Sequence, residues 1–197
     1  MNTRKNIANL TAAAMFVALI TLAGAISIPV PPSPSPVNFV DMFVILAGLC
    51  LGLKYGLATV ATYIILGAIG VPVFSGLTGG WGILMTARGG FIFSFIPAVI
   101  VTGAASGRRS EMTNNAPQNH QRRLVATAIT AALAYIIIFA GGMFYARYLA
   151  TPNIQSWSAV LSMMLVPFIP GTVLKFGVIL LLQRHVITQI QGGLSAK

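Results

Sequence analysis

LVATAITAALAYIIIFAGGMF, residues 124–144, is the stretch that decides the fold class. It holds no charged side chain, and its apolar residues follow one another without the alternation of a membrane β-strand. An α-helix needs about 20 predominantly apolar residues to cross the hydrocarbon core of a bilayer. The stretch therefore predicts a transmembrane helix.

The composition of the whole chain extends this prediction. Of its 197 residues, 56% are hydrophobic and only 7% are charged, whereas a soluble domain carries about 25% charged residues. A chain this apolar cannot cover a water-facing surface. We therefore expect an all-α, polytopic membrane protein with a single integral membrane domain over residues 1–197, and no room for a soluble enzymatic domain.

Further apolar runs on both sides of the opening stretch predict a bundle of six transmembrane helices. The predicted spans are residues 9–28, 37–53, 57–69, 89–107, 124–144 and 159–182, with Lys54-Tyr55-Gly56 as a tight turn between the second and the third. The first span is read as a retained helix, because no small-residue cleavage site follows it.

The segments between the runs carry proline or polar residues. Residues 29–36 are Pro-rich and predict an extended connector, while residues 108–123 predict a polar loop. Pro167 and Pro170 interrupt the last run, which predicts a short interfacial piece followed by a proper helix from Gly171.

The basic residues predict the orientation. The chain carries 12 Lys and Arg against two Asp and Glu, for a formal net charge of +10. With both termini in the cytoplasm, most of these basic residues fall on the inner side, as the positive-inside rule requires. Orientation in the bilayer thus explains the charge, and no nucleic-acid partner is expected. Only Arg88, Arg147 and Lys175 fall on the outer side or within the membrane.

Ionisable groups in or beside the bilayer are costly and mark functional positions. Arg88 lies between Gly-rich segments, where the backbone can approach a ligand, so we favour a ligand role for it. Asp41 and Lys175 either bind a ligand or pair with one another across the bundle. For Arg147 we favour snorkelling to the interface. A pocket with two or three cations and one anion suits an organic anion.

The sequence offers few candidate residues for enzymatic catalysis. The sequence has no phosphate-binding P-loop, Cys/His cluster, Ser/His/Asp set or carboxylate pair, and one of its two acidic residues, Glu111, lies in the predicted cytoplasmic loop. We therefore expect no cofactor, no metal, and no ATP hydrolysis by this chain alone.

Ala14 and Ala18 form a small-xxx-small pattern, which permits close helix approach, either to a partner or within the bundle.

Several short motifs, in order, resemble the BioY family, the biotin-binding S components of energy-coupling factor (ECF) transporters. The motifs are Ile26-Ser-Ile-Pro29, Pro34-Ser-Pro36, Met42-Phe-Val-Ile-Leu-Ala-Gly48, Leu66-Gly-Ala-Ile-Gly-Val-Pro-Val-Phe74, Gly79-Gly-Trp-Gly82, Gly89-Gly-Phe91 and Pro167-Phe-Ile-Pro-Gly171. The resemblance implies six helices in the cell membrane of a prokaryote and an outward-facing substrate pocket. It also implies that the alanine pattern meets a transmembrane coupling subunit joined to two ATPase subunits.

The sequence departs from the family pattern at three places. A Thr-Leu-Gln-Thr-like stretch reads Asn38-Phe-Val-Asp41, the acid usual before the lysine is Thr172, and Gly-Pro-Thr-Gly-Gly reads Thr86-Ala-Arg-Gly-Gly90. Asp41 could replace the missing acid and accept hydrogen bonds from the ureido group of biotin. Alternatively, the pocket serves another carboxylate such as lipoate, which has no ureido ring.

The first hypothesis is a membrane-embedded subunit that binds biotin or a close relative. Its carboxylate would meet Arg88 or Lys175 by charge-assisted hydrogen bonds. The head group would lie among Trp81, Phe91, Asn38, Asp41 and Thr172. The hypotheses from other classes are an intramembrane enzyme, a structural membrane protein, and a transporter that works without ATPases.

Overall fold

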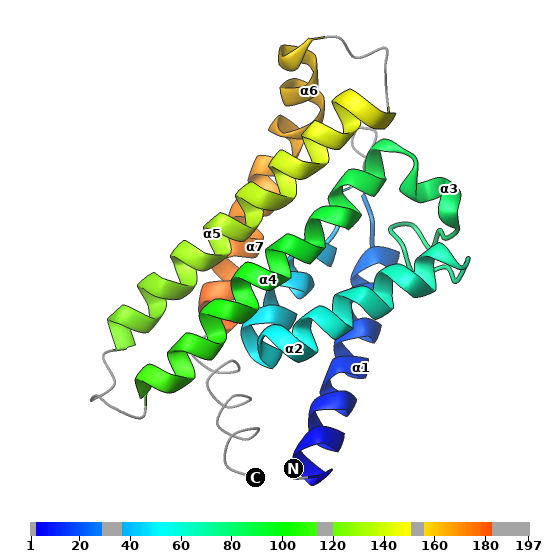
Figure 1. The fold of residues 1–197 in the computed structure, drawn as a ribbon. Coiled ribbons are helices and arrows are strands. Elements are labelled where there is room, and N and C mark those ends of the chain that lie inside the picture. The colour runs from blue at the N-terminus through cyan, green and yellow to red at the C-terminus, as the bar shows by residue number, and fades with distance from the viewer. Residues whose placement is uncertain (1–2, 29–36, 114–119, 151–155, 183–197) are drawn as a thin grey trace.

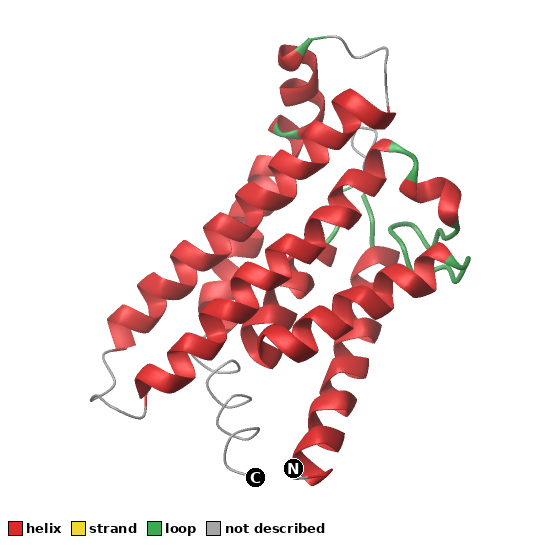
Figure 2. Cartoon of the chain, viewed as in Figure 1, coloured by secondary structure: helices red, strands yellow, loops and turns green. Residues whose placement is uncertain are grey.

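The computed structural model describes residues 3–28, 37–113, 120–150 and 156–182. Helices make up nearly all of these ranges (Figures 1 and 2), which confirms the predicted all-α class. The elements are α1 (Thr3–Ala25), α2 (Val40–Ala68), α3 (Trp81–Leu84), α4 (Ala87–Thr113), α5 (His120–Tyr145), the π-helix η1 (Ala146–Ala150), α6 (Trp157–Met164), the 3₁₀-helix η2 (Val166–Phe168) and α7 (Ile169–Leu182). Within the described ranges the β-structure consists of two isolated bridges, Ile28 with Val37 and Phe74 with Thr78.

Helix α2 is two helical arms that fold back on each other at Gly52. Gly52 has φ 73° and ψ −174°, a conformation that glycine adopts without the steric cost of a Cβ. A Cβ on Gly56 would lie 3.1 Å from the Cα of Gly48, although residues eight apart lie about 12 Å apart along a continuous helix. The chain therefore reverses at Gly52 (Figure 1), close to the turn predicted at residues 54–56.

The predicted helices recur with shifted boundaries. Five described helices are long and apolar enough to cross a membrane, with α2 counted once. Because α2 reverses at Gly52, its two arms correspond to the predicted spans 37–53 and 57–69. Each arm is shorter than the roughly 20 residues of a typical span, and the two arms lie against each other at Gly48 and Gly56.

The predicted loop over residues 108–123 is wrong in extent. Helix α4 continues to Thr113 and α5 already begins at His120, so that only residues 114–119, outside the described ranges, are left between them. Arg occurs on both flanks, with Glu and Met in residues 108–113 and Gln in residues 120–123, and all four are good helix formers. A polar composition marks the membrane boundary here but not the end of the helix.

The last apolar run is divided as the prolines predict. Pro167 lies in η2 and Pro170 in the first turn of α7, where the missing N–H has no intrahelical partner to lose. The short helix α6 precedes them, and α7 begins at Ile169, two residues before the predicted start. The predicted extended connector 29–36 lies outside the described residues, but its flanks are tied together by the backbone hydrogen bonds of Ile28 and Val37, 2.8 and 2.9 Å long.

The core lies where α2 and α4 pack on each other, with α1 and α5 on either side. Close approach depends on glycine, because a Cβ at Gly103 of α4 would lie 2.6 Å from the Cα of Leu53 in α2. Large apolar side chains such as Leu22, Ile136 and Leu181 remain exposed, as is usual for surfaces that face lipid. The start of α1, the end of α4 and the start of α5 lie at one end of the bundle, and α3 and α6 at the other (Figure 1).

Candidate ligand-binding cavity

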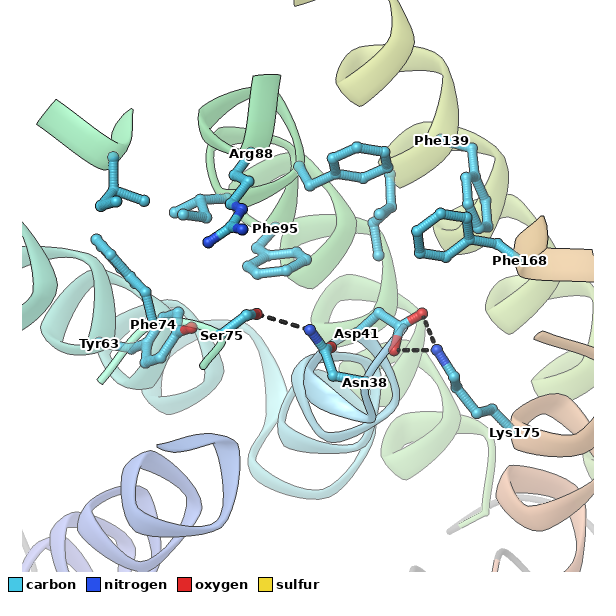
Figure 3. A pocket seen from close by; sticks show the side chains of 14 residues that line it. Asn38, Asp41, Tyr63, Phe74, Ser75, Arg88, Phe95, Phe139, Phe168 and Lys175 are labelled. Carbon is cyan, nitrogen blue, oxygen red and sulfur yellow. Dashed lines mark hydrogen bonds and ion pairs between the residues drawn. The ribbon is translucent and has the colours of Figure 1, made fainter. Parts of the chain in front are cut away.

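A cavity opens among α2, α4, α5 and α7, beneath α3 and the segment that precedes it (Figure 3). We call it the central cavity; its volume is about 50 Å³. Its lining combines ionisable, polar and aromatic side chains. These are Asn38, Asp41, Tyr63, Phe74, Ser75, Ile83, Arg88, Phe91, Ile92, Phe95, Ile138, Phe139, Phe168 and Lys175.

An ion pair between Asp41 and Lys175 crosses the cavity floor from α2 to α7. The Lys175 Nζ donates to Oδ1 of Asp41 at 2.8 Å and to Oδ2 at 2.9 Å. Both residues are buried: Asp41 is 8% exposed and Lys175 is 2% exposed. Asp41 lies in the first turn of α2 and also accepts from the Met42 backbone N–H at 3.0 Å, where the helix dipole favours a negative charge. Mutual pairing is one of the two alternatives predicted for these residues, and the structure shows it.

Asn38 fixes the entry to α2 and one wall of the cavity. Its Oδ1 accepts from the Val40 backbone N–H at 3.0 Å, two residues on, which forms an Asx turn just before the helix. Its Nδ2 donates to the Ser75 Oγ at 2.6 Å. These two contacts attach the segment around Ser75, which closes into the Phe74–Thr78 bridge, to the first turn of α2.

Arg88 supplies the second cation of the cavity. It lies in the first turn of α4, and its guanidinium points into the cavity (Figure 3). Because Asp41 offsets the charge of Lys175, the three ionisable side chains Asp41, Arg88 and Lys175 sum to one net positive charge. A cavity of this balance suits a ligand with one carboxylate, which a guanidinium binds by charge-assisted hydrogen bonds.

Three phenylalanines form the apolar side of the cavity. The ring of Phe91 lies 6.1 Å from that of Phe139 and 6.2 Å from that of Phe168, and Phe139 and Phe168 are 5.9 Å apart. They come from α4, α5 and η2, so the cluster joins helices that are distant in sequence. Such a surface fits a compact, largely apolar ring system, while the polar groups opposite fix its orientation.

The structure gathers five of the seven predicted ligand residues. Asn38, Asp41, Arg88, Phe91 and Lys175 line the central cavity. Trp81 does not: it is 61% exposed, because the short helix α3 buries Leu84 and turns Ile83 toward the cavity instead. Thr172 lies on α7 but borders a neighbouring cavity between α5 and α7.

Three further predicted positions lie outside the cavity. Arg147 lies at the end of the bundle that holds α6, with its guanidinium 4.6 Å from the ring centroid of Trp157 and 5.5 Å from that of Tyr148. Ala14 and Ala18 are exposed on α1, whereas Ala13 and Ile20 face the core. The alanine pattern is therefore not used for packing within the described part of the chain.

Sequence reasoning missed Ser75 and most of the aromatic lining. Phe74 and Phe168 stand within motifs that carry the family resemblance, so they could have been nominated with their neighbours. Phe95, Ile138 and Phe139 lie in uniformly apolar runs, where the sequence does not separate a cavity-facing side chain from a lipid-facing one.

Comparison with known proteins gives one consistent family. The family model described as the BioY family matches residues 1–192. The biotin transporter BioY of Rhizobium etli is 32% identical over 186 residues, which cover 91% of this chain and 92% of that protein.

Shorter but closer matches come from two other organisms. The probable biotin transporter BioY of Pyrococcus horikoshii is 40% identical over 101 residues, and the biotin transporter BioY of Thermotoga maritima is 41% identical over 97 residues. The matched regions span 61% and 56% of the length of these two relatives.

A solved structure has the same fold. It is the 2.1 Å crystal structure of the S-component for biotin from an ECF-type ABC transporter. The TM-score is 0.76 at 24% identity, and the match covers 94% of this chain and 95% of that one. This likeness confirms the predicted S-component type of helix bundle.

Proposed function

The chain belongs to the BioY family, and we propose that it is the substrate-binding S component of an ECF-type importer, with biotin as its substrate. The observation that carries the proposal is the central cavity, in which Arg88 faces a buried Asp41–Lys175 pair and an aromatic wall. The names of the relatives supply the substrate class, and the chemistry of the lining argues for it independently.

The groups of biotin find complementary partners in this lining. Its carboxylate pairs with Arg88, whose guanidinium points into the cavity. Its ureido group offers two N–H donors and a carbonyl acceptor, which match the acceptor oxygens of Asp41 and the amide of Asn38. Its fused rings lie against Phe91, Phe139 and Phe168. With a volume of about 50 Å³, the cavity has room for only a few water molecules, so we expect lining side chains to move apart when biotin enters.

Lipoate, the alternative substrate, fits this lining less well. Its dithiolane ring has no donor for Asp41 and no hydrogen-bonding group for Asn38. Binding it would add no hydrogen bond to either side chain, so both would keep only the partners that they already have, Lys175 for Asp41 and Ser75 for Asn38. A carboxylate contact with Arg88 alone would remain.

The proposal includes the orientation and the partners. The chain is a single membrane domain, over residues 1–197, in the cell membrane of a prokaryote, with both termini in the cytoplasm and the cavity toward the outside. The exposed Ala14 and Ala18 face of α1 docks on a transmembrane coupling subunit, because small side chains allow close helix approach in lipid. That subunit connects to two ATPase subunits, which hydrolyse the ATP.

A role as an enzyme has little support in the cavity. Among the described residues, Asp41 is the only carboxylate in its lining, and both of its oxygens are engaged by Lys175. General acid–base chemistry needs a group free to exchange a proton with a substrate. Binding followed by handover to other subunits requires no such group.

The direct test is calorimetry on the purified chain in detergent, with biotin and lipoate as ligands. We expect biotin to bind and lipoate to bind at least tenfold more weakly. Equal affinity would shift the proposal to a general carboxylate carrier, and binding of neither would refute it. Uptake of biotin by cells that lack ATPase subunits would instead identify a transporter that works without them.

A further inference from the structure

Ser75 holds a side-chain hydroxyl against the central cavity. The residue lies in the segment between α2 and α3 and is only partly buried, so a ligand in the cavity can reach it. Its backbone is fixed by a turn, because the Thr78 Oγ1 donates to the Ser75 carbonyl oxygen at 3.0 Å and Phe74 beside it forms the bridge with Thr78. The fold therefore sets the position of the hydroxyl before any ligand binds.

The orientation of the Asn38 amide decides how Ser75 can hydrogen-bond. The Val40 backbone N–H can only donate, so the Asn38 atom that it contacts at 3.0 Å must be the carbonyl oxygen Oδ1. The amide nitrogen Nδ2 then faces Ser75, 2.6 Å from its Oγ (Figure 3). Because an amide nitrogen only donates, the Ser75 oxygen is the acceptor in this bond.

The hydroxyl proton of Ser75 is left over for a ligand. A serine hydroxyl accepts through its oxygen lone pairs and donates one proton. Asn38 occupies one lone pair, and within the described part of the chain the Ser75 hydroxyl donates to no protein atom. Arg88 also points into the cavity (Figure 3) and, as a guanidinium, can only donate. This side of the cavity therefore offers protons, and it is complementary to an acceptor atom of the ligand.

We propose that Ser75 is a ligand-binding residue whose hydroxyl donates to the ureido carbonyl oxygen of the substrate, and that Asn38 is the positioning residue that directs this proton. The inference rests on the proposed function, in which the ureido N–H groups meet Asp41. In a ureido ring each N–H lies beside the carbonyl oxygen, so a carbonyl near Asn38 and Ser75 leaves an N–H for Asp41, three residues after Asn38.

Two features of the hydrogen bonding favour this arrangement. The carbonyl oxygen has two lone pairs, so it accepts from Ser75 without giving up the Asn38 amide. The bond from Asn38 polarises the hydroxyl that accepts it, which makes Ser75 a stronger donor to the next group in the chain. Ser75 thereby becomes a residue that selects for a carbonyl oxygen at this point of the ligand.

The test compares three ligands by calorimetry on the purified chain in detergent at neutral pH. Biotin has both the ureido carbonyl oxygen and the carboxylate, and biotin amide keeps the carbonyl oxygen but has no carboxylate. In 2-iminobiotin the carboxylate remains, while the carbonyl oxygen is replaced by nitrogen in a cyclic guanidinium that can only donate. Ser75→Ala should weaken biotin and its amide about five- to tenfold each, the loss of one hydrogen bond, and 2-iminobiotin less than about twofold.

Three further variants support the comparison. Ser75→Thr keeps the hydroxyl and should bind biotin within about twofold of the unsubstituted chain. Ser75→Cys puts a weak S–H donor in its place and should show the same pattern as Ser75→Ala, which keeps the test decisive if the alanine variant does not fold. Thr78→Val is the matched control, because it removes a hydroxyl of the same turn that does not line the central cavity, and it should leave all three affinities unchanged.

Asn38→Asp tests the positioning role. The introduced carboxylate can still accept from the Val40 N–H, but its second oxygen would accept the Ser75 proton instead of donating to the hydroxyl. Biotin should bind at least about fivefold more weakly. Adding Ser75→Ala should then weaken biotin less than about twofold further, because the hydroxyl no longer donates to the ligand. Additive losses in the double variant would refute the positioning role.

The pattern across the ligands separates a direct contact from a structural effect. An equal loss of all three ligands in Ser75→Ala, or no loss of biotin, would refute the contact with the carbonyl oxygen. A loss of biotin and 2-iminobiotin but not of the amide would place the contact on the carboxylate and refute it as well, as would a Thr78→Val variant that behaves like Ser75→Ala. In these cases the unsubstituted chain still binds biotin and the proposed function stands. If the unsubstituted chain binds no biotin, the proposed function and this inference fall together.

Discussion

Lys175 of α7 and Asp41 of α2 are joined through both carboxylate oxygens, at 2.8 and 2.9 Å, although 134 residues separate them. The pair ties the last described helix to the second, across the floor of the central cavity. The expected acid of α7 is Thr172 in this chain, and the geometry shows Asp41 in contact with the lysine instead. The charge that α7 lacks is thus supplied from α2.

Removing one member of this pair should destabilise the protein more than removing both. Asp41→Asn leaves a buried, unpaired ammonium group, which costs about 3–5 kcal/mol in comparable cases. The double variant Asp41→Asn with Lys175→Met removes both charges of the pair and should recover most of that loss. Thermal unfolding in detergent measures the difference. A double variant as unstable as the single one would mean that the pair does not act through charge.

Arg88 should matter for the carboxylate of the ligand and not for its rings. Arg88→Ala should weaken biotin about 10- to 100-fold, the equivalent of the roughly 1.5–3 kcal/mol of a hydrogen bond to a charged group. The same substitution should change the affinity for the uncharged biotin amide less than threefold. Calorimetry with both ligands measures this contrast.

Arg147→Ala is the control for Arg88→Ala, because Arg147 contacts the rings of Tyr148 and Trp157 and does not line the central cavity. It removes the same charge near the same end of the bundle and should leave both affinities unchanged. An equal loss for biotin and its amide in Arg88→Ala would place the carboxylate elsewhere.

The sequence predicts the membrane part of this fold well because transfer into lipid depends on local composition. Each apolar run predicts one helix, and the prolines at positions 167 and 170 predict the break in the last run, before α7. The predicted turn lies two residues beyond the reversal at Gly52, because Lys54-Tyr55-Gly56 is the more polar segment while the backbone angle that turns the chain belongs to Gly52.

The site is predictable where the sequence is unusual for a membrane helix. Asp41, Arg88 and Lys175 stand out as charges among apolar residues, and all three line the cavity. Phe139 does not stand out, since lipid and cavity accept the same aromatic side chain. Which face of an apolar helix meets the cavity depends on neighbours distant in sequence. For the same reason the sequence predicts Trp81 as a ligand residue although it is exposed.

The reversal in α2 should depend on the backbone freedom of Gly52. Its φ of 73° with ψ of −174° lies in a region of backbone conformation that is essentially restricted to glycine, and a residue with a Cβ held there costs about 1–3 kcal/mol. We expect Gly52→Ala to lower the free energy of unfolding by this amount, although a Cβ at this position would meet no atom within 4 Å. Gly82→Ala is the matched control, because Gly82 also has open space around it and its φ is not positive. Equal stability of the two alanine variants would exclude backbone strain as the cause.

The exposed alanines of α1 should matter only in the complete transporter. Ala14→Leu and Ala18→Leu add bulk to an exposed helix face, so the unfolding temperature and biotin affinity of the isolated chain should stay the same. In cells that contain coupling and ATPase subunits, the same variants should lose most of the co-purified partners and of biotin uptake, since a leucine keeps the two helices apart. Ala104→Leu, at an exposed alanine of α4, is the control and should retain both. Loss of partners in Ala104→Leu as well would show that the effect is not specific to α1, and full uptake by both α1 variants would place the docking surface on another helix.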